Sequence, residues 1–337
     1  MNKRLILVII FSILLSNLPG KALAYYESAT LGDLKTKVSP QNPGINQKTT
    51  ITLSSYLMNI DACNIIWSEN NQTAKEGTGQ KSFSFITGDL GQTTLISANL
   101  NCNNNQVKKD WVFQTNDIEF LISADTYTPP FYKGGSRATS KSNVKILALP
   151  QIFNTNGEPS NNENLIYRWT KDGKNMPTSS GYGKNSLTIQ TNDLVGGTSY
   201  KLEVLSLLGE IKATKSVTIN IENPKIIIYE NKPLLGTQYQ KGLTNLFNLE
   251  QNEITLIAEP FFFSNLDITN DSFSFNWTMN GKKINTDVND RSIILRQDTN
   301  QTGEALIGLQ IINLNNVFSS ASEILKINFN QKDILSF

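Results

Sequence analysis

The sequence predicts an all-β protein in which three tandem antiparallel β-sandwiches follow an N-terminal signal peptide. Three observations support this prediction. A short strand pattern that contains a tryptophan occurs three times, and its copies lie about 100 residues apart, which is the length of one sandwich. The composition is the third observation: only 18% of the residues are charged, and Asn, Thr, Ser and Ile are abundant, which favours strands and turns over helices.

The repeated pattern places one tryptophan on each of three short alternating runs. The runs contain Trp67, Trp169 and Trp277 and end at Asn-Asn, Asp-Gly and Asn-Gly, respectively. Asp-Gly and Asn-Gly are the strongest local signals for a strand that enters a tight hairpin, and the first copy lacks the glycine. A buried tryptophan on this strand is the usual centre of such a sandwich, so we expect all three to be core residues; binding of a ligand by these rings is the alternative.

The repeats also predict the domain organisation. A chain of 337 residues suits two or three domains of about 100 to 150 residues, and the threefold repetition favours three. Short connections around 115–117 and 222–224 predict a semi-rigid, extended rod. The expected segments are a signal peptide at 1–24, three domains at 25–117, 118–222 and 223–330, and a C-terminal tail at 331–337.

Further strands are predicted in the same order in each domain from runs that alternate apolar and polar residues. The first run, 37–44, contains Pro40 and Pro43 and is expected at a sheet edge, because proline cannot donate to a ladder. The other predicted strands are 49–54, 82–86, 93–101 and 106–113 in the first domain, 144–149, 186–189, 199–204 and 216–221 in the second, and 254–258, 292–295, 305–311 and 324–329 in the third.

The N-terminus has the features of a secretory signal. Lys3 and Arg4 precede an apolar run over 5–15, and Ala22-Leu23-Ala24 is a small-residue cleavage pattern, so we expect cleavage before Tyr25. An uncleaved membrane anchor is the alternative, but the apolar run is shorter than the ~20 residues that cross a bilayer. No second apolar span follows, so we expect an exported protein without a stable membrane span, in the periplasm, at the cell surface or secreted.

The order of the strands, the tryptophan on the third strand with its hairpin, and the late paired strands resemble the PKD and immunoglobulin-like domains of bacterial exported and surface proteins. The whole layout also resembles uncharacterised signal-peptide proteins of small-genome bacteria, in which the segments 127–134 and 229–234 look like recurring landmarks. The resemblance implies a spacer, an adhesion module or an assembly scaffold, and it brings no catalytic residue.

Cys63 and Cys102 are the two cysteines of the chain. Export makes an oxidising compartment plausible, and Cys63 opens the first tryptophan strand while Cys102 follows the strand predicted at 93–101. In a sandwich of the immunoglobulin type these strands are antiparallel neighbours, so the start of one meets the end of the other. We therefore expect a disulfide within one sheet, unlike the bond between sheets in antibody domains; two unpaired thiols are the alternative.

Catalytic chemistry has little support in the sequence. The chain contains no histidine, which excludes the usual general base, the usual metal ligand and any triad built on imidazole. The acids are scattered through turn-forming stretches, where aspartate is expected for backbone reasons; examples are Asp193, Asp267, Asp271, Asp287 and Asp290. The loose oxygen-rich loop at 267–271 is a weak calcium candidate. We therefore expect no enzyme, no cofactor and no metal site, with a carboxylate-dependent hydrolase as a remote alternative.

The most distinctive stretch for a binding role is aromatic and rich in proline. It contains Tyr127, Pro129, Pro130, Phe131 and Tyr132, and we place it on the first strand of the second domain. Aromatic and proline side chains present contact area at a small entropic cost, so the segment is a candidate edge for partner recognition. The alternative is a kinked edge strand that packs against the first domain.

A run of three phenylalanines, 261–263, is a second candidate contact. Successive side chains of an extended segment point to opposite faces, so at least one ring must be exposed if the segment is extended and one face is solvated. A contact with the second domain or with a partner would hide it. We therefore regard Phe262, like the residues of segment 127–132, as a candidate for partner binding.

Taken together, these patterns indicate a non-enzymatic, exported, multi-domain scaffold, spacer or protein-binding rod at the cell envelope or surface. The alternative is a carbohydrate-binding or adhesion module, for which Tyr127, Phe131 and Tyr132 are the best aromatic candidates. The expected partner is another envelope or surface protein, or a glycan. Nucleic acid is not expected, because the formal charge is +1 with the signal peptide and becomes −2 when Lys3, Arg4 and Lys21 are removed with it.

Overall fold

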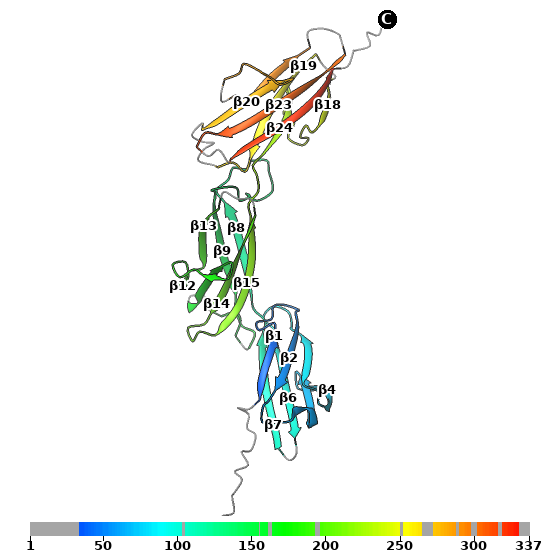
Figure 1. The fold of residues 1–337 in the computed structure, drawn as a ribbon, viewed down its shortest axis with the longest axis vertical. Coiled ribbons are helices and arrows are strands. Elements are labelled where there is room, and N and C mark those ends of the chain that lie inside the picture. Colours follow the sequence, from blue (N-terminus) through cyan, green and yellow to red (C-terminus); the bar gives the residue numbers. More distant parts are fainter. Residues whose placement is uncertain are drawn as a thin grey trace, which may run out of the picture. The chain divides into compact units, whose positions relative to one another are not determined.

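The computed structural model describes residues 34–102, 105–154, 156–160, 164–192, 196–249, 252–264, 272–287, 290–297, 302–315 and 319–329. The predicted signal peptide at 1–24 and the predicted tail at 331–337 lie outside these residues. The described chain consists almost entirely of strands and turns (Figure 1), and it includes a short 3-10 turn, Ile60–Ala62. It divides into two compact units, of which the first contains the described residues up to Gln41, Lys48–Ile86 and Thr94–Phe113, and the second contains the rest.

The first sandwich forms the first unit. Its two sheets have the strand orders β1-β2-β5 and β4-β3-β6-β7. Between them lies a hydrophobic cluster centred on Trp67. The bounds of the strands are β1 Lys35–Ser39, β2 Lys48–Ser54, β3 Asn64–Glu69, β4 Gln72–Thr78, β5 Ser82–Ile86, β6 Thr93–Cys102 and β7 Asn105–Gln114.

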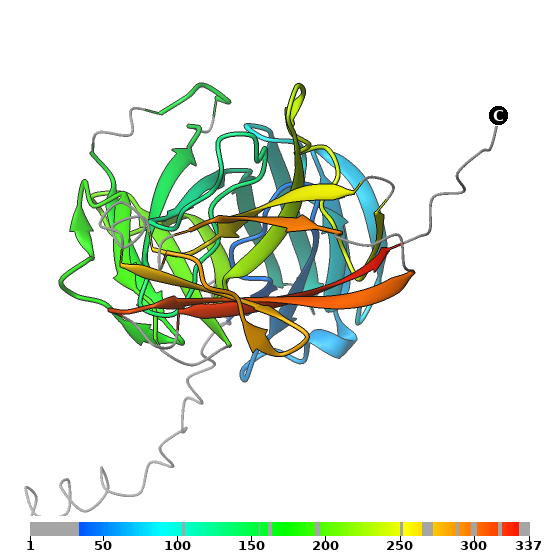
Figure 2. The same cartoon turned by 90° about the horizontal axis from the view of Figure 1, so that it is seen from above.

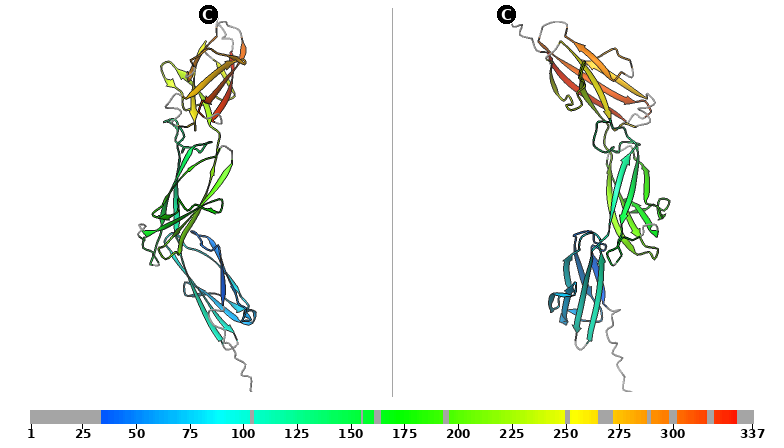
Figure 3. Two further views of the ribbon diagram at one scale, coloured as in Figure 1. Left: turned by 60° about the vertical axis from the view of Figure 1, so that its left-hand side comes forward. Right: turned by 180° about the vertical axis from the view of Figure 1, so that it is seen from behind.

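The second sandwich belongs to the second unit and repeats this arrangement. Its sheets have the orders β13-β9-β8 and β11-β10-β14-β15, with the short β12 paired to β10. Figure 3 shows this sandwich in green in two further views. Trp169 lies in the cluster between them. The bounds of the strands are β8 Asp117–Ala124, β9 Asn143–Gln151, β10 Ile166–Lys171, β11 Lys174–Asn175, β12 Gly181–Tyr182, β13 Ser186–Gln190, β14 Gly197–Leu205 and β15 Ile211–Asn220.

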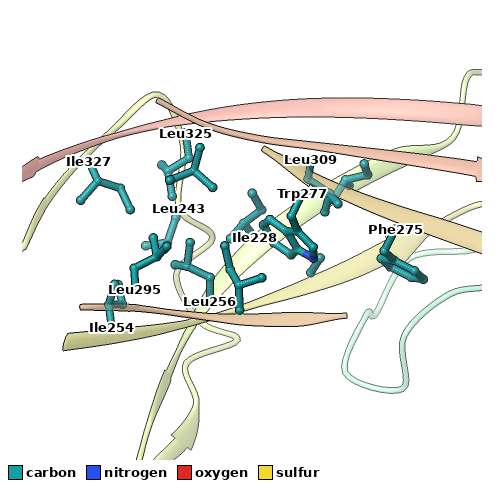
Figure 4. Packing of buried hydrophobic residues seen from close by; sticks show 14 of the residues in the cluster. Ile228, Leu243, Ile254, Leu256, Phe275, Trp277, Leu295, Leu309, Leu325 and Ile327 are labelled. Carbon is teal, nitrogen blue, oxygen red and sulfur yellow. The ribbon is translucent and has the colours of Figure 1, made fainter. Parts of the chain in front are cut away.

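The third sandwich has the sheets β17-β16-β19-β22 and β18-β24-β23-β20-β21. Figure 2 shows the red β24 beside the orange β23 in one layer. In Figure 4 apolar side chains from both layers point toward one another around Trp277. The bounds of the strands are β16 Lys225–Lys232, β17 Gly236–Thr237, β18 Leu246–Leu249, β19 Glu253–Phe261, β20 Phe273–Met279, β21 Lys282–Lys283, β22 Ser292–Arg296, β23 Gly303–Asn313 and β24 Ser320–Phe329.

The three tryptophan hairpins have the same geometry. Both central residues of each two-residue loop have positive φ, with values of 49° and 66° at Asn70-Asn71, 47° and 77° at Asp172-Gly173, and 52° and 78° at Asn280-Gly281. This is the type I′ turn, whose twist matches that of the flanking strands. The first copy forms it without glycine because asparagine tolerates the left-handed region better than most residues.

Each hairpin is fixed to the strand beside it by the first residue of its turn. The side-chain oxygen of Asn70 accepts a hydrogen bond from the backbone N–H of Leu95 at 3.0 Å. Asp172 and Asn280 accept the equivalent bonds from Ser199 and Leu306, each at 2.9 Å. The residue types that the sequence repeats at this position are therefore short side chains with an acceptor oxygen.

Each indole is fully enclosed and also hydrogen-bonded. The exposed fraction of Trp67, Trp169 and Trp277 is 0%. Their Nε1–H groups donate to backbone carbonyls that precede the next strand of the opposite sheet, namely those of Gln80 at 2.8 Å, Lys184 at 3.0 Å and Asp290 at 3.0 Å. Burial of the ring therefore leaves no unsatisfied N–H, which is the usual condition for a tryptophan in a core.

The expected disulfide is confirmed. Cys63 and Cys102 form a bond with a Cα–Cα distance of 4.4 Å. The register of β3 and β6 places Asn64 opposite Asn101, so the cysteines are the next pair of the same antiparallel ladder. The bond lies within one sheet, as the sequence predicted.

Three longer strands, β4, β8 and β16, were not among those that the sequence predicted. β4 follows the first tryptophan hairpin, and most of its side chains are exposed, so its sequence has little apolar alternation to detect. β16 opens the third sandwich, and its apolar residues are consecutive. No helix in the described part of the chain is both long enough and apolar enough to cross a lipid bilayer.

Candidate functional site

The aromatic segment 127–132 lies in the connection between β8 and β9. Our expectation that it forms part of the first strand of the second domain was wrong, because β8 ends at Ala124. Pro129 and Pro130 are adjacent residues without a backbone N–H, so the segment cannot continue a ladder. It turns instead, and the N–H of Tyr132 donates to the carbonyl of Pro129 at 2.9 Å.

Two backbone hydrogen bonds join this segment to the third sandwich. The N–H of Tyr127 donates to the carbonyl of Phe263 at 2.6 Å, and the N–H of Phe262 donates to the carbonyl of Tyr127 at 2.7 Å. Thr126 and Ser264 form an isolated antiparallel bridge beside them. The alternative interpretation placed the segment against the first domain, whereas these bonds attach it to the residues that follow β19.

Six aromatic rings then form an aromatic cluster. The ring of Phe131 stacks on that of Tyr239, with centroids 3.9 Å apart and planes at 22°. Tyr132 meets Phe261 and Phe262 edge to face at 5.5 Å and 5.8 Å. Such ring pairs each contribute about 0.5 to 1.5 kcal/mol beyond the burial of their area. The members are Phe131, Tyr132, Tyr229, Tyr239, Phe261 and Phe262.

The three consecutive phenylalanines are all buried. Phe261, Phe262 and Phe263 have exposed fractions of 4%, 5% and 0%. The expectation of one exposed ring depended on an extended backbone, and the backbone is not extended at Phe262, where φ is 65°. The left-handed conformation is rare for an aromatic residue and costs on the order of 1 to 3 kcal/mol. The contacts of the Phe262 ring within the aromatic cluster and the backbone bond to Tyr127 offset that cost.

A buried acid lies beneath the cluster. Glu259 is 9% exposed, and its Oε1 accepts a hydrogen bond from the Tyr239 hydroxyl at 3.3 Å. Burial raises the pKa of the Glu259 carboxyl, and the nearby Arg291 guanidinium opposes part of this shift. Burial also raises the pKa of the Tyr127 hydroxyl, and the neighbouring Glu259 carboxylate acts in the same direction.

The raised pKa of Glu259 predicts a pH dependence of stability. The folded state binds the proton of this carboxyl more tightly than the unfolded chain does, so its contribution is fully present below the ordinary value of 4.5 and is lost as the pH rises through the folded value. In Glu259→Gln this loss is absent. We expect the unfolding midpoint of the third sandwich, measured in urea from pH 4 to pH 7, to fall less in the variant than in the parent protein.

Glu304→Gln is the matched control for this measurement. Glu304 is exposed on β23 of the same sandwich and pairs with Lys326 at 2.7 Å. An exposed ion pair contributes about 0 to 1 kcal/mol, so this variant should keep the pH profile of the parent. Parallel profiles of the parent and Glu259→Gln would contradict the assignment.

The described residues include no cluster of side chains that could hold a metal ion, since no group of three or more Cys, Asp and Glu side chains among them is placed to do so. Asp290 accepts the backbone N–H of Asp287 at 3.0 Å and so stabilises a turn. Asp193 and the weak calcium candidate at 267–271 lie outside the described part of the chain.

The structure brings together the predicted binding residues Tyr127, Phe131, Tyr132 and Phe262. Pro129 is buried and Pro130 is exposed beside them. Sequence reasoning missed Tyr239, Glu259 and Arg291, which are single residues without a motif. Tyr229 belongs to the landmark segment 229–234, and that was the only signal available for this part of the cluster.

No family model and no curated protein matches the sequence. Solved structures that match include three N-terminal domains of the outer capsid protein Hoc of bacteriophage RB49, with 12% identity over 88% of this chain and 98% of that chain at a TM-score of 0.24. The central fibronectin-III array of RIM-binding protein matches with 10% identity over 87% and 95% at a TM-score of 0.29.

A third match is the glucan-utilisation protein SGBP-B of Bacteroides ovatus, solved with a mixed-linkage heptasaccharide. It has 11% identity over 85% of this chain and 65% of that chain, at a TM-score of 0.22. Within this chain, each core lies between a sheet built on the first two strands and a sheet built on the tryptophan strand, as in immunoglobulin domains. The chain is therefore a tandem array of immunoglobulin-like β-sandwiches.

Proposed function

We propose that this protein is a non-enzymatic, exported scaffold or spacer that holds its second and third sandwiches together and presents a surface to a protein partner at the cell envelope. The observation that supports the proposal is the contact of segment 127–132 with the third sandwich. Its aromatic rings and the backbone of Tyr127 are engaged by the third sandwich. A spacer needs fixed joints, and a pre-organised joint lowers the entropic cost of presenting a binding surface.

The same contacts favour the spacer over a carbohydrate-binding module. A sugar-binding platform needs exposed aromatic faces, and the candidates were Tyr127, Phe131 and Tyr132. The face of Phe131 is covered by Tyr239 at 3.9 Å, and Tyr132 is in edge contact with two phenylalanines. The rings of Phe131 and Tyr132 therefore make contacts within the chain and are only half-exposed. We keep the domain boundaries 25–117, 118–222 and 223–330 as part of the proposal.

The test is the double variant Phe131→Ala/Tyr132→Ala. We call the contact between segment 127–132 and the third sandwich the joint. The double variant removes the ring contacts of this joint but leaves the cores of the second and third sandwiches intact. We expect trypsin to cleave after Lys225, the first residue of β16 and the residue that follows the connection between the second and third sandwiches, about tenfold faster. This corresponds to the loss of about 1.4 kcal/mol from two or more ring pairs.

Tyr182→Ala is the matched control, because Tyr182 is an aromatic residue of the second sandwich that is 60% exposed. The urea midpoints of the second and third sandwiches should stay unchanged in both variants, which shows that the cleavage reports the joint and not unfolding. Equal cleavage rates in the double variant, the control and the parent would remove the observation on which the spacer proposal depends.

A further inference from the structure

The last strand of the third sandwich has an edge that is only partly covered. β24 pairs with β23 from Ser320 to Phe329. On its other side, β18 pairs with β24 only from Lys326 to Phe329. The first part of β24 therefore has a free edge with respect to the described strands.

The ladder pattern shows which backbone groups this edge presents. The N–H of Lys326 donates to the carbonyl of Asn245, outside the β23 ladder, at 2.9 Å. Successive residues of a strand direct their backbone groups to alternate sides, so every second residue of β24 faces away from β23. Ser320 and Ser322 are in phase with Lys326. Their N–H and C=O groups therefore point to the free edge.

The first strand of the third sandwich presents a second free edge. β16 pairs with β19, and on the side away from β19 the carbonyls of Ile228 and Glu230 accept the N–H groups of Leu243 and Gln238 at 2.7 Å and 2.8 Å. Ile226 is in phase with these two residues. Its backbone N–H and C=O face the same side, before the stretch that those two bonds cover.

Both free edges line one groove of about 420 Å³. Its walls are Asn223–Ile227 on one side and Ser320–Glu323 on the other, and Gln310 of β23 also lines it. The volume lies within the ~300 to 1,000 Å³ of ligand sites. A row of alternating backbone donors and acceptors is complementary to the backbone of another strand, so an extended polypeptide fits this groove better than a compact small molecule.

The second sandwich shows how a comparable gap is closed. There the first residue of β8, Asp117, accepts hydrogen bonds from the ammonium group of Lys215 on β15 at 3.0 and 3.2 Å. In the third sandwich the first residue of β16 is Lys225 and the acid on β24 is Glu323, so the charges are reversed. The nearest acid to Lys225 is instead Glu222, at 4.0 Å, and the groove lies between the two strands.

From these observations we propose that the groove between β16 and β24 binds an extended peptide segment of a partner protein, which adds to β24 as a further strand and places a basic side chain near Glu323. The inference rests on the proposed function as a protein-binding scaffold and names the binding site. The carboxylate of Glu323 supplies the charge complementarity, and the backbone groups of Ser320 and Ser322 supply the strand pairing.

The test uses the full chain and the acetylated, amidated peptide Thr-Val-Lys-Val-Thr-Val as the probe. Hydrogen exchange read by mass spectrometry should slow over 320–325 when the peptide is added at millimolar concentration. Ser322→Pro removes one outward N–H but no bond to β23, since proline is tolerated at a sheet edge. It should weaken binding about fivefold or more, the loss expected for one hydrogen bond. Ser322→Ala keeps the N–H and should bind like the parent.

Further measurements test whether Glu323 binds the lysine of the probe and whether β24 pairs with the peptide. Glu323→Gln should weaken binding of the lysine-containing probe but leave a probe with threonine in place of lysine unaffected. Absence of protection in the parent, or equal protection in Ser322→Pro and Ser322→Ala, would overturn the proposal. Protection that rises with protein concentration without the peptide would also overturn it, because the edge would then bind a second copy.

The joint variant Phe131→Ala/Tyr132→Ala separates this inference from the spacer proposal. Its substitutions lie outside the groove walls, so it should bind the probe as the parent does. If the joint does not loosen but the peptide binds, the spacer proposal fails and the groove stands. If the joint loosens but no peptide binds, the groove fails alone.

Discussion

Replacing Trp67 with alanine is expected to lower the free energy of unfolding of the first sandwich by about 3 to 5 kcal/mol. The ring is 0% exposed and stacks on Phe83 and Trp111 with centroids 5.3 Å and 5.8 Å away. Its N–H donates to the carbonyl of Gln80 at 2.8 Å. The variant would leave a cavity between the two sheets and a buried carbonyl without its donor. Urea denaturation followed by far-UV circular dichroism and by hydrogen exchange in β3 and β6 measures the loss.

Trp111→Ala is the matched control in the same sandwich. Trp111 contacts Trp67 from β7 but is only half-buried, so its removal should cost less than half as much. Trp67→Phe keeps an aromatic ring but loses the indole N–H, and we expect an intermediate cost of about 1 to 3 kcal/mol for the unpaired carbonyl. Equal losses for Trp67→Ala and Trp111→Ala would show that the repeated tryptophan is not the centre of its core.

Removal of the disulfide is expected to have the second largest effect. Cys63 and Cys102 are separated by 39 residues in the sequence. On the chain-entropy model, a closed loop of this length contributes about 3 to 4 kcal/mol by restricting the unfolded chain. The double variant Cys63→Ala/Cys102→Ala should therefore lower the urea midpoint of the first sandwich and leave those of the second and third unchanged, because both cysteines lie in the first unit.

Reduction of the parent protein with dithiothreitol provides an independent comparison. It should reproduce the shift of the double variant, since each treatment opens the same loop without moving a strand. If neither reduction nor substitution changes the midpoint of the first sandwich, the bond does not contribute to its stability. A shift in the second or third sandwich would mean that the sandwiches do not unfold independently.

The repeated tryptophan hairpin could be predicted because its signals are local. A two-residue turn with both φ angles positive needs glycine, asparagine or aspartate, and the chain has such residues at 70–71, 172–173 and 280–281. The alternation around each tryptophan reports which side chains point inward. These signals lie within about ten residues of one another, so they can be recognised in the sequence without knowledge of the fold.

The joint could not be predicted in the same way. The stack of Phe131 on Tyr239 and the backbone bonds between Tyr127 and 262–263 join residues more than one hundred positions apart. No local pattern states which distant surface an aromatic side chain will meet. The turn at Phe262 was missed for a related reason, because an aromatic residue rarely has positive φ and adopts it only when long-range contacts offset the strain.

The sequence by itself therefore determined the all-β class, the three tandem sandwiches, the buried indole at the centre of each and the cysteine pair, since turn chemistry, side-chain alternation and repetition act over short stretches. Only the tertiary structure decided where segment 127–132 attaches, that Glu259 is buried beneath it, and that β16 and β24 leave a groove between them. These features depend on which strand edges and side chains meet after folding, and that is set by packing between elements far apart in the chain.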